Sequence, residues 1–370
     1  MNIQNNRKDK LPCLFDWADK ELAQDSFLCW LLEWANSTPD NRSDFPERRV
    51  GFEFLKRILV KAKATIPSEN DTVSVRVFKQ IQHIDIAALI EFNDSRVGLL
   101  IEDKVNASLY NDIDSYCKNL NAQNDFSSAT IYPVIVRTGD ACQIGEVKVP
   151  CFLREDFLSL FNDCHNEVKK SQILLDFYTH LHNIDSALKM YETRPLAEWD
   201  WNCWKGFFEA LRRSGKVVQN EWTIVNRPDG GFVCAYPSWQ SKHAYFTGNL
   251  VMYWQFESDR QRLALKIIID DIKVDQRRNR LVREYVLGQI DEYLNKTPDW
   301  KAIIKVARGR VGCSMTLKEI PADGWYRELD GKIDMNAVLE RLEKINKFRD
   351  ALVEMLLSDK NKERLLDISK

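Results

Sequence analysis

The stretch HIDIAALIEFNDSRVGLLIEDKV, residues 83–105, decides the fold of the N-terminal half of this chain. Both of its halves are rich in β-branched and aliphatic residues, which is typical of strands, and Asn93-Asp94 between them is a turn signal. A two-residue turn at that point sets the register of an antiparallel hairpin. Continued toward the open end of the hairpin, this register places Asp85 directly opposite Glu102.

Three ionisable side chains converge if this register is right. Directly opposed residues have Cβ atoms about 4.5–5.5 Å apart and point to the same face of the sheet. Glu102 and Lys104 are two residues apart on one strand and therefore share a face, whereas the side chain of Asp103 points to the other. The sequence thus predicts a cluster of Asp85, Glu102 and Lys104.

Such a cluster has a definite chemistry. Two carboxylates this close repel each other, which favours a bound cation. Carboxylate oxygens with positions left for water and phosphate suit Mg²⁺. A metal of this kind lowers the pKa of a bound water, and Lys104 can orient that water or neutralise charge on a phosphate. The alternative is a surface carboxylate pair with a lysine partner that contributes only to solubility.

Working outward, the same half predicts helices on either side of one mixed sheet, an α/β or α+β arrangement. The run ELAQDSFLCWLLEWA, which follows Asp19, has Leu22, Phe27, Trp30, Leu31 and Trp34 at roughly helical spacing. Further helices are expected over 49–64, 109–121 and 171–191. The run VPCFLREDFLSLF is expected to lead into another helix. Strands are expected over 73–80, 83–92, 96–105 and 129–140. We take residues 1–193 as the first domain.

Residues 194–370 predict a second, α+β domain. The run WDWNCWKGFFEALRRSG reads as a helix that Gly215 ends. Strands follow over 221–226, 230–239, 243–256, 262–270 and 310–320, with helices over 276–294 and 335–357. This domain is expected to serve substrate binding, sensing or assembly.

At Asp85, Glu102 and Lys104 the chain resembles the PD-(D/E)XK nuclease superfamily, whose motif places an aspartate on one strand and (D/E)-x-K on the next. Here HIDIAALIEF and LLIEDK supply the two parts. The helix ELAQDSFLCWLLEW, a helix carrying Tyr116 and the later VIVRTGD resemble one bacterial branch. The resemblance covers roughly residues 15–190 and implies a restriction-endonuclease-like fold, a mixed sheet flanked by helices.

The resemblance also implies roles for single residues. Asp85 and Glu102, with the carbonyl of Asp103, would bind Mg²⁺, for which Mn²⁺ could substitute, and Lys104 would be catalytic.

Two further positions match polar residues of the superfamily site. Glu21 matches an accessory acidic residue, and Gln80 matches a polar residue near the site. The chain departs from the pattern at Ile84, where a proline is often found, and at Asp112, where relatives often have a glutamine.

The expected function is therefore that of a cytoplasmic, Mg²⁺-dependent nuclease that cuts DNA rather than RNA. Members of the superfamily often act in bacterial defence against foreign DNA, so the resemblance suggests this role. An RNA-directed nuclease is a further alternative. The rival is a catalytically silent nucleic-acid-binding or scaffolding protein that keeps the fold. Homo-oligomer formation stays open.

Composition limits these expectations. A net charge of −2 excludes a polybasic protein that coats nucleic acid by bulk charge, but permits a local basic groove. Nine scattered cysteines without CxxC spacing argue against a disulfide framework or structural zinc, and favour reduced thiols in a cytoplasmic protein. No apolar run is long enough for a membrane span, and the N-terminus lacks the pattern of a secretory signal.

Two clusters in the C-terminal half have competing interpretations. Lys273, Arg277 and Arg280 would share one helix face and could follow a phosphate backbone, although a solvated helix face is the simpler explanation. The tryptophans could stack on bases, although core packing is commoner for such residues; they are Trp199, Trp201, Trp204 and Trp222.

Overall fold

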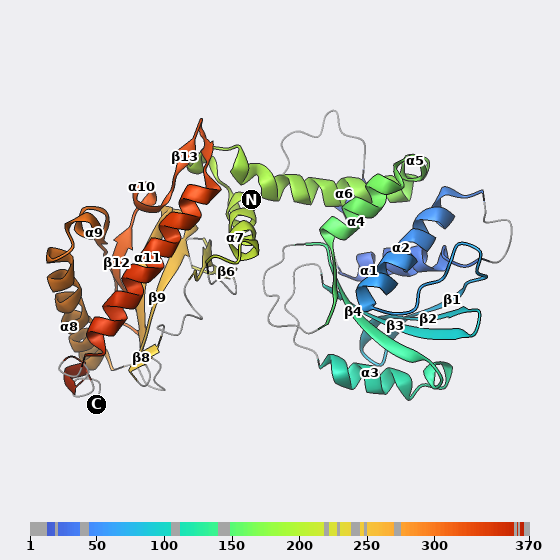
Figure 1. The fold of residues 1–370 in the computed structure, drawn as a ribbon, viewed down its shortest axis with the longest axis horizontal. Helices are drawn as coiled ribbons and strands as arrows, with labels where there is room; N and C mark the ends of the chain where they lie inside the picture. Colours follow the sequence, from blue (N-terminus) through green and yellow to red (C-terminus); the bar gives the residue numbers. More distant parts are fainter. Residues whose placement is uncertain are drawn as a thin grey trace. The chain divides into compact units, whose positions relative to one another are not determined.

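The computed structural model divides the chain into two compact units, residues 1–186 and 187–370, and each is considered by itself (Figure 1). The structure describes residues 13–18, 21–37, 44–104, 112–139, 149–217, 222–227, 230–237, 245–247, 250–269, 275–358, 361 and 363–365. Both units combine helices with a sheet, so the chain is α+β, as predicted.

Unit 1 is built on a five-stranded mixed sheet in the order β1-β2-β3-β4-β5. The first three strands form an antiparallel meander, while β4 and β5 run parallel to β3. The strands are β1 (Ser74–Ile81), β2 (Ile84–Phe92), β3 (Ser95–Lys104), β4 (Thr130–Arg137) and β5 (Cys151–Leu153). The predicted mixed sheet is confirmed, and β5 is a strand that the sequence analysis did not identify.

Helices cover both faces of this sheet, and Figure 1 shows α1 and α2 on the opposite side from α3. The larger core packs α1, α2, α4 and α6 against strand residues such as Ile86 and Ile101. The smaller core packs α3 and η3 against alternate residues such as Ala87 and Leu100. The helices of unit 1 are α1 (Glu21–Glu33), α2 (Pro46–Ala62), α3 (Ile113–Asn121), α4 (Arg154–Asp163), α5 (His165–Val168) and α6 (Gln172–Lys189), with short 3₁₀ turns η1 (Leu14–Asp16) and η3 (Asn124–Phe126).

The first helix departs from its predicted face. Phe27 and Leu31 are buried, as predicted, but Leu22 is 56% exposed and the polar residues Gln24 and Asp25 are buried instead. Spacing of apolar residues therefore placed the inner face of α1 only approximately, because it gave no weight to polar partners supplied from elsewhere in the fold. Asp19, which precedes the helix, lies outside the described residues.

Unit 2 is built on an antiparallel sheet in the order β11-β12-β10-β9-β7-β6, with β8 also paired to β9. Its strands are β6 (Trp222–Val225), β7 (Phe232–Ala235), β8 (Tyr245–Thr247), β9 (Leu250–Glu257), β10 (Arg262–Ile269), β11 (Lys305–Val306) and β12 (Ser314–Ile320), with a separate hairpin of β13 (Glu328–Leu329) and β14 (Lys332–Ile333). Its helices are α7 (Trp201–Arg213), α8 (Gln276–Asn295), α9 (Pro298–Ile303), α10 (Ala322–Trp325) and α11 (Met335–Leu356), with 3₁₀ turns η4 (Met190–Glu192), η5 (Leu196–Glu198) and η6 (Ser258–Arg260).

The tryptophan cluster belongs mainly to the core of unit 2. Trp199, Trp204 and Trp222 are buried, and the rings of Trp199 and Trp204 lie 5.1 Å apart in an edge-on arrangement. Base stacking is therefore wrong for these three residues, and core packing is confirmed for them. Trp201 differs, since 44% of it is exposed.

Two further findings bear on the sequence predictions. The cysteines that the structure describes are free thiols. Among the described helices, none combines the length and the apolar character needed to cross a membrane.

Candidate functional site

The β2–β3 hairpin has the predicted register. Paired residues run from Phe92 opposite Ser95 to Ile86 opposite Ile101, and Asn93 in the turn adopts the left-handed conformation at φ 49°. Asp85 and Glu102 are the next residues along this register. Strand alternation places both on the α3 face, together with Lys104.

The ammonium group of Lys104 lies among three oxygen atoms. Its Nζ is 3.0 Å from Glu102 Oε1 and 3.2 Å from Asp85 Oδ2, and it donates to the backbone carbonyl of Asp103 at 2.8 Å. Asp85 Oδ2 also accepts a hydrogen bond from the backbone N–H of Asp103 at 2.9 Å. The structure thus brings together the four residues that the sequence singled out on this hairpin.

Burial makes these charges interact strongly. Glu102 is 1% exposed and the side chain of Lys104 11% exposed, whereas that of Asp85 is 27% exposed. Burial by itself would lower the pKa of Lys104. The hydrogen bond and charge of Glu102, with the charges of Asp85 and Glu21, outweigh burial and raise that pKa. Lys104 is therefore a cation at neutral pH in this arrangement.

A second pair of carboxyl groups, those of Asp103 and Asp25, lies on the other face of β3. The side chain of Asp103, fully buried, accepts a hydrogen bond from Gln24 Nε2 at 2.5 Å, and Thr138 Oγ1 donates to Gln24 Oε1. Burial raises the pKa of Asp103 well above its ordinary value, against the hydrogen bond from Gln24, and the charge of Asp25 adds to the rise. Burial also raises the pKa of Asp25, followed by the charge of Asp85.

This inner network was not predicted from the sequence. Gln24 lies three, four and seven residues before Phe27, Leu28 and Leu31, so it belongs to the apolar face of α1 by helical spacing. A polar residue on an apolar helix face was the signal in the sequence that could have revealed this network. Gln24 holds Asp103 against α1, so that the backbone of Asp103 presents its carbonyl to Lys104.

The accessory residues predicted from the resemblance lie near the hairpin. Glu21 is the first residue of α1, and its charge contributes to the pKa shift of Lys104. Tyr116 on α3 has a raised pKa, caused first by burial and then by the charges of Glu102 and Asp85. Both residues are therefore within electrostatic reach of the cluster.

Gln80 borders a cavity beside Asp85. This cavity, about 550 Å³, is formed by residues 80 and 82–85, and neither Glu102 nor Lys104 lines it. Gln80, Gln82 and His83 all have left-handed backbone, at φ 54°, 51° and 67°. Non-glycine residues rarely adopt this conformation, and such strain clusters at functional sites.

The oxygen donors at Lys104 define which metal could be held. Within the described part of the chain, no three or more His, Cys, Asp or Glu side chains are grouped to hold a metal ion. The set available is two carboxylates and one carbonyl, all oxygen atoms, within 3.2 Å of a point that a cation already occupies. Such a set fits Mg²⁺, which binds through one or two carboxylates and keeps several waters.

The predicted basic face of α8 is only partly described. The helix begins at Gln276, with Asp275 as its N-cap, and Lys273 lies outside the described residues. Arg277 and Arg280 are exposed on its first turns.

Comparison with known proteins yields no match: no protein-family model, no curated protein and no solved structure is similar enough to this chain to be reported.

Proposed function

We propose that unit 1 is a metal-dependent nuclease with a restriction-endonuclease-like fold, and that it hydrolyses phosphodiester bonds in DNA. The observation that carries the proposal is the meeting of Asp85, Glu102 and the carbonyl of Asp103 at one cationic nitrogen. Two carboxylates and a carbonyl, with further positions for water and a phosphate oxygen, are ligands that suit Mg²⁺.

Each residue has a role in this proposal. Asp85, Glu102 and the Asp103 carbonyl would hold the metal, which when bound lowers the pKa of a water ligand and offsets charge on the phosphate. Lys104 acts as a cation rather than as a base, because its pKa is raised. Its ammonium group stabilises the negative charge that develops on the phosphate during attack by water.

Glu21 supports Lys104 in its charged form from the start of α1. The inner network of Gln24, Asp103 and Thr138 holds β3 against α1 and so positions the carbonyl of Asp103. These groups position the reacting residues and do not touch the substrate in this proposal.

The test is a cleavage assay with Mg²⁺ or Mn²⁺ on double-stranded DNA, single-stranded DNA and RNA in parallel. We expect the wild type to cut DNA, and Lys104→Gln to lose at least about 100-fold in rate, the size of effect found when one charge-stabilising donor is removed. Lys118→Gln on the exposed side of α3 is the matched control and should retain activity.

Two outcomes separate the rivals. Equal cleavage by wild type and Lys104→Gln would refute the site. Calorimetric titration with Mg²⁺ addresses the scaffolding alternative: a catalytic site binds the metal in wild type and loses it in Asp85→Asn, whereas a silent scaffold need not bind it at all. Preferential cleavage of RNA would transfer the proposal to that substrate.

A further inference from the structure

The sheet of unit 2 has two unlike faces. On one face, Phe256 of β9 contacts Phe207 of α7 and Trp325 of α10, at ring distances of 5.7 and 5.0 Å. Trp254, two residues earlier, donates from its indole nitrogen to the carbonyl of Ile345 on α11. The main apolar core of unit 2 is therefore on this side of β9.

The opposite face carries charge at the end where η6 connects β9 and β10. Glu257 of β9 is paired in register with Arg262 of β10, and strand alternation puts Lys266 on the same face. Glu257 is 2% exposed, and its Oε2 lies 2.8 Å from Arg262 Nε and 2.5 Å from Nη2. Its Oε1 lies 3.4 Å from Lys266 Nζ. One buried carboxylate thus fixes two cations on this face of the sheet.

Arginines from other segments surround this buried group. Arg227, which follows β6, forms an ion pair with Asp259 at 2.8 Å. Arg308 and Arg310, between β11 and β12, are exposed, and neither forms an ion pair with any residue that the structure describes. Arg260 completes the set from η6, between β9 and β10.

Gly309 explains why two of these arginines come so close to the sheet. A Cβ atom at this residue would lie 2.8 Å from the backbone oxygen of Thr316 on β12, too close for any side chain. The segment of Arg308 and Arg310 is therefore held directly against β12.

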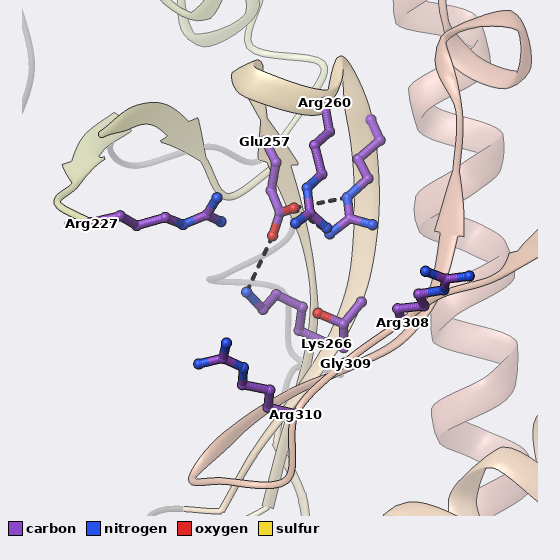
Figure 2. A pocket seen from close by; sticks show the side chains of 9 residues that line it. Arg227, Glu257, Arg260, Lys266, Arg308, Gly309 and Arg310 are labelled. Atoms are coloured by element: carbon purple, nitrogen blue, oxygen red, sulfur yellow. Dashed lines mark hydrogen bonds and ion pairs between the residues drawn. The ribbon is translucent and has the colours of Figure 1, made fainter. Parts of the chain in front are cut away.

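These residues line one cavity of about 970 Å³. Figure 2 shows Arg227, Lys266 and Arg310 extending toward the same space from three separate segments. Glu257 is the one carboxylate among the lining residues described, and it faces six cations: Arg227, Arg260, Arg262, Lys266, Arg308 and Arg310. Two carboxylates outside the lining also pair with these cations: Asp259 with Arg227, and Glu319 with Arg262. After Glu257, Asp259 and Glu319 are each set against one cation, three positive charges remain in excess.

We propose that this cavity binds a compact polyphosphate anion, the chemistry shared by inorganic triphosphate and the phosphate chain of a nucleoside triphosphate. A guanidinium group can donate two parallel hydrogen bonds to phosphate oxygens, and five arginines line this one cavity. The volume is near the upper end of the roughly 300–1,000 Å³ of ligand pockets, so it exceeds the size of one phosphate.

The lining favours a compact anion over a strand of nucleic acid. Single strands are held by a groove that follows the backbone and by aromatic side chains on which the bases stack. No aromatic side chain is among the described residues that line this cavity, and its cations gather around one space instead of forming a row. The inference is independent of the nuclease proposal, since every residue in it belongs to unit 2.

Calorimetric titration of the full chain tests the inference. Sodium triphosphate, ATP and a short single-stranded oligonucleotide without terminal phosphate are the probes, with EDTA present so that metal binding in unit 1 contributes nothing. We expect triphosphate to bind the wild type with an affinity that falls as salt rises. If ATP binds more tightly than triphosphate, the ligand of the cavity is a nucleoside triphosphate. If the two bind equally, the cavity recognises the phosphate chain alone.

The double variant Arg308→Ala/Arg310→Ala should weaken triphosphate binding at least about 10-fold, because it removes two charged donors without breaking an ion pair. Lys344→Ala/Lys347→Ala is the matched control: it removes the same charge from exposed positions on α11, which contacts the opposite face of the sheet. Its affinity should stay within about 2-fold of wild type.

Three results would overturn the inference. They are an absence of binding by triphosphate and ATP, equal weakening in the two double variants, and binding of the oligonucleotide that triphosphate neither matches nor displaces. The last result would assign the cavity to a nucleic-acid strand.

Discussion

Replacing Lys104 with methionine removes the cation from the meeting point of Asp85 and Glu102 while keeping most of the apolar stem. The ammonium group lies within 3.2 Å of both carboxylates and of the Asp103 carbonyl. Without it, a carboxylate that is 1% exposed faces another across the hairpin with no intervening cation. We therefore expect Lys104→Met to destabilise unit 1 when metal is absent.

The magnitude follows from the burial. Removing one partner of a buried ion pair costs about 3–5 kcal/mol. The side chain of Asp85 is 27% exposed and partly screened by water, so the lower end of the range applies, about 3 kcal/mol. A unit of this size shifts its melting temperature by about 2–4 °C per kcal/mol, so we expect a decrease of roughly 6–12 °C.

The effect of Mg²⁺ on stability should differ between wild type and Lys104→Met. In the wild type a divalent cation must compete with the ammonium group for the same oxygens, whereas in Lys104→Met it has no competitor. Ligand that binds only the folded state raises stability with its concentration. Differential scanning calorimetry with EDTA and with Mg²⁺ should therefore show the larger Mg²⁺-dependent increase in Lys104→Met.

Lys118→Met on the exposed side of α3 controls for the loss of one positive charge. The role given to Lys104 is refuted if Lys104→Met melts within about 1 °C of wild type in EDTA, well below the shift expected for a buried pair. It is also refuted if Mg²⁺ raises the melting temperature of both proteins by the same amount.

Two further predictions address packing and thiol chemistry. Gly51→Ala should destabilise unit 1 by about 1–3 kcal/mol, because its Cβ would lie 2.6 Å from the carbonyl oxygen of Leu31, whereas Gly288→Ala on α8 meets no atom within 4 Å and should stabilise unit 2 by about 0.5–1 kcal/mol. Urea unfolding measures both, and changes of the same sign would contradict the packing argument. Burial raises the pKa of Cys29 to about 11, so its thiolate is scarce below that pH and its alkylation should accelerate about tenfold per pH unit from pH 8 to 10. Mass spectrometry should find the exposed Cys313 modified first, and equal labelling of the two thiols at about pH 8 would show that Cys29 is not protected.

The hairpin was predictable because its geometry is local. A two-residue turn at Asn93-Asp94 determines the register, and the register determines that Asp85 lies beside Glu102. The inner network was not predictable in the same way, since Gln24 meets Asp103 across 79 residues of sequence. Apolar spacing alone placed the exposed Leu22 on the inner face of α1.

The cationic cavity of unit 2 escaped prediction for a related reason. The density of basic residues indicated a candidate phosphate-binding face at the start of α8, where Arg277 and Arg280 are close in sequence. The residues that converge in space come instead from three segments, represented by Arg227, Lys266 and Arg310, and no local pattern connects them.

The local character of the hairpin also bears on the order of folding. Every atom that meets at Lys104 Nζ belongs to residues 85–104, so closing this segment costs little conformational entropy. Pairing of β3 with β4, by contrast, is parallel and needs the long crossover between them to close. The contacts of the Lys104 ammonium group are thus made within a short piece of chain, whereas the contacts of Gln24 that hold Asp103 against α1 require distant segments to come together.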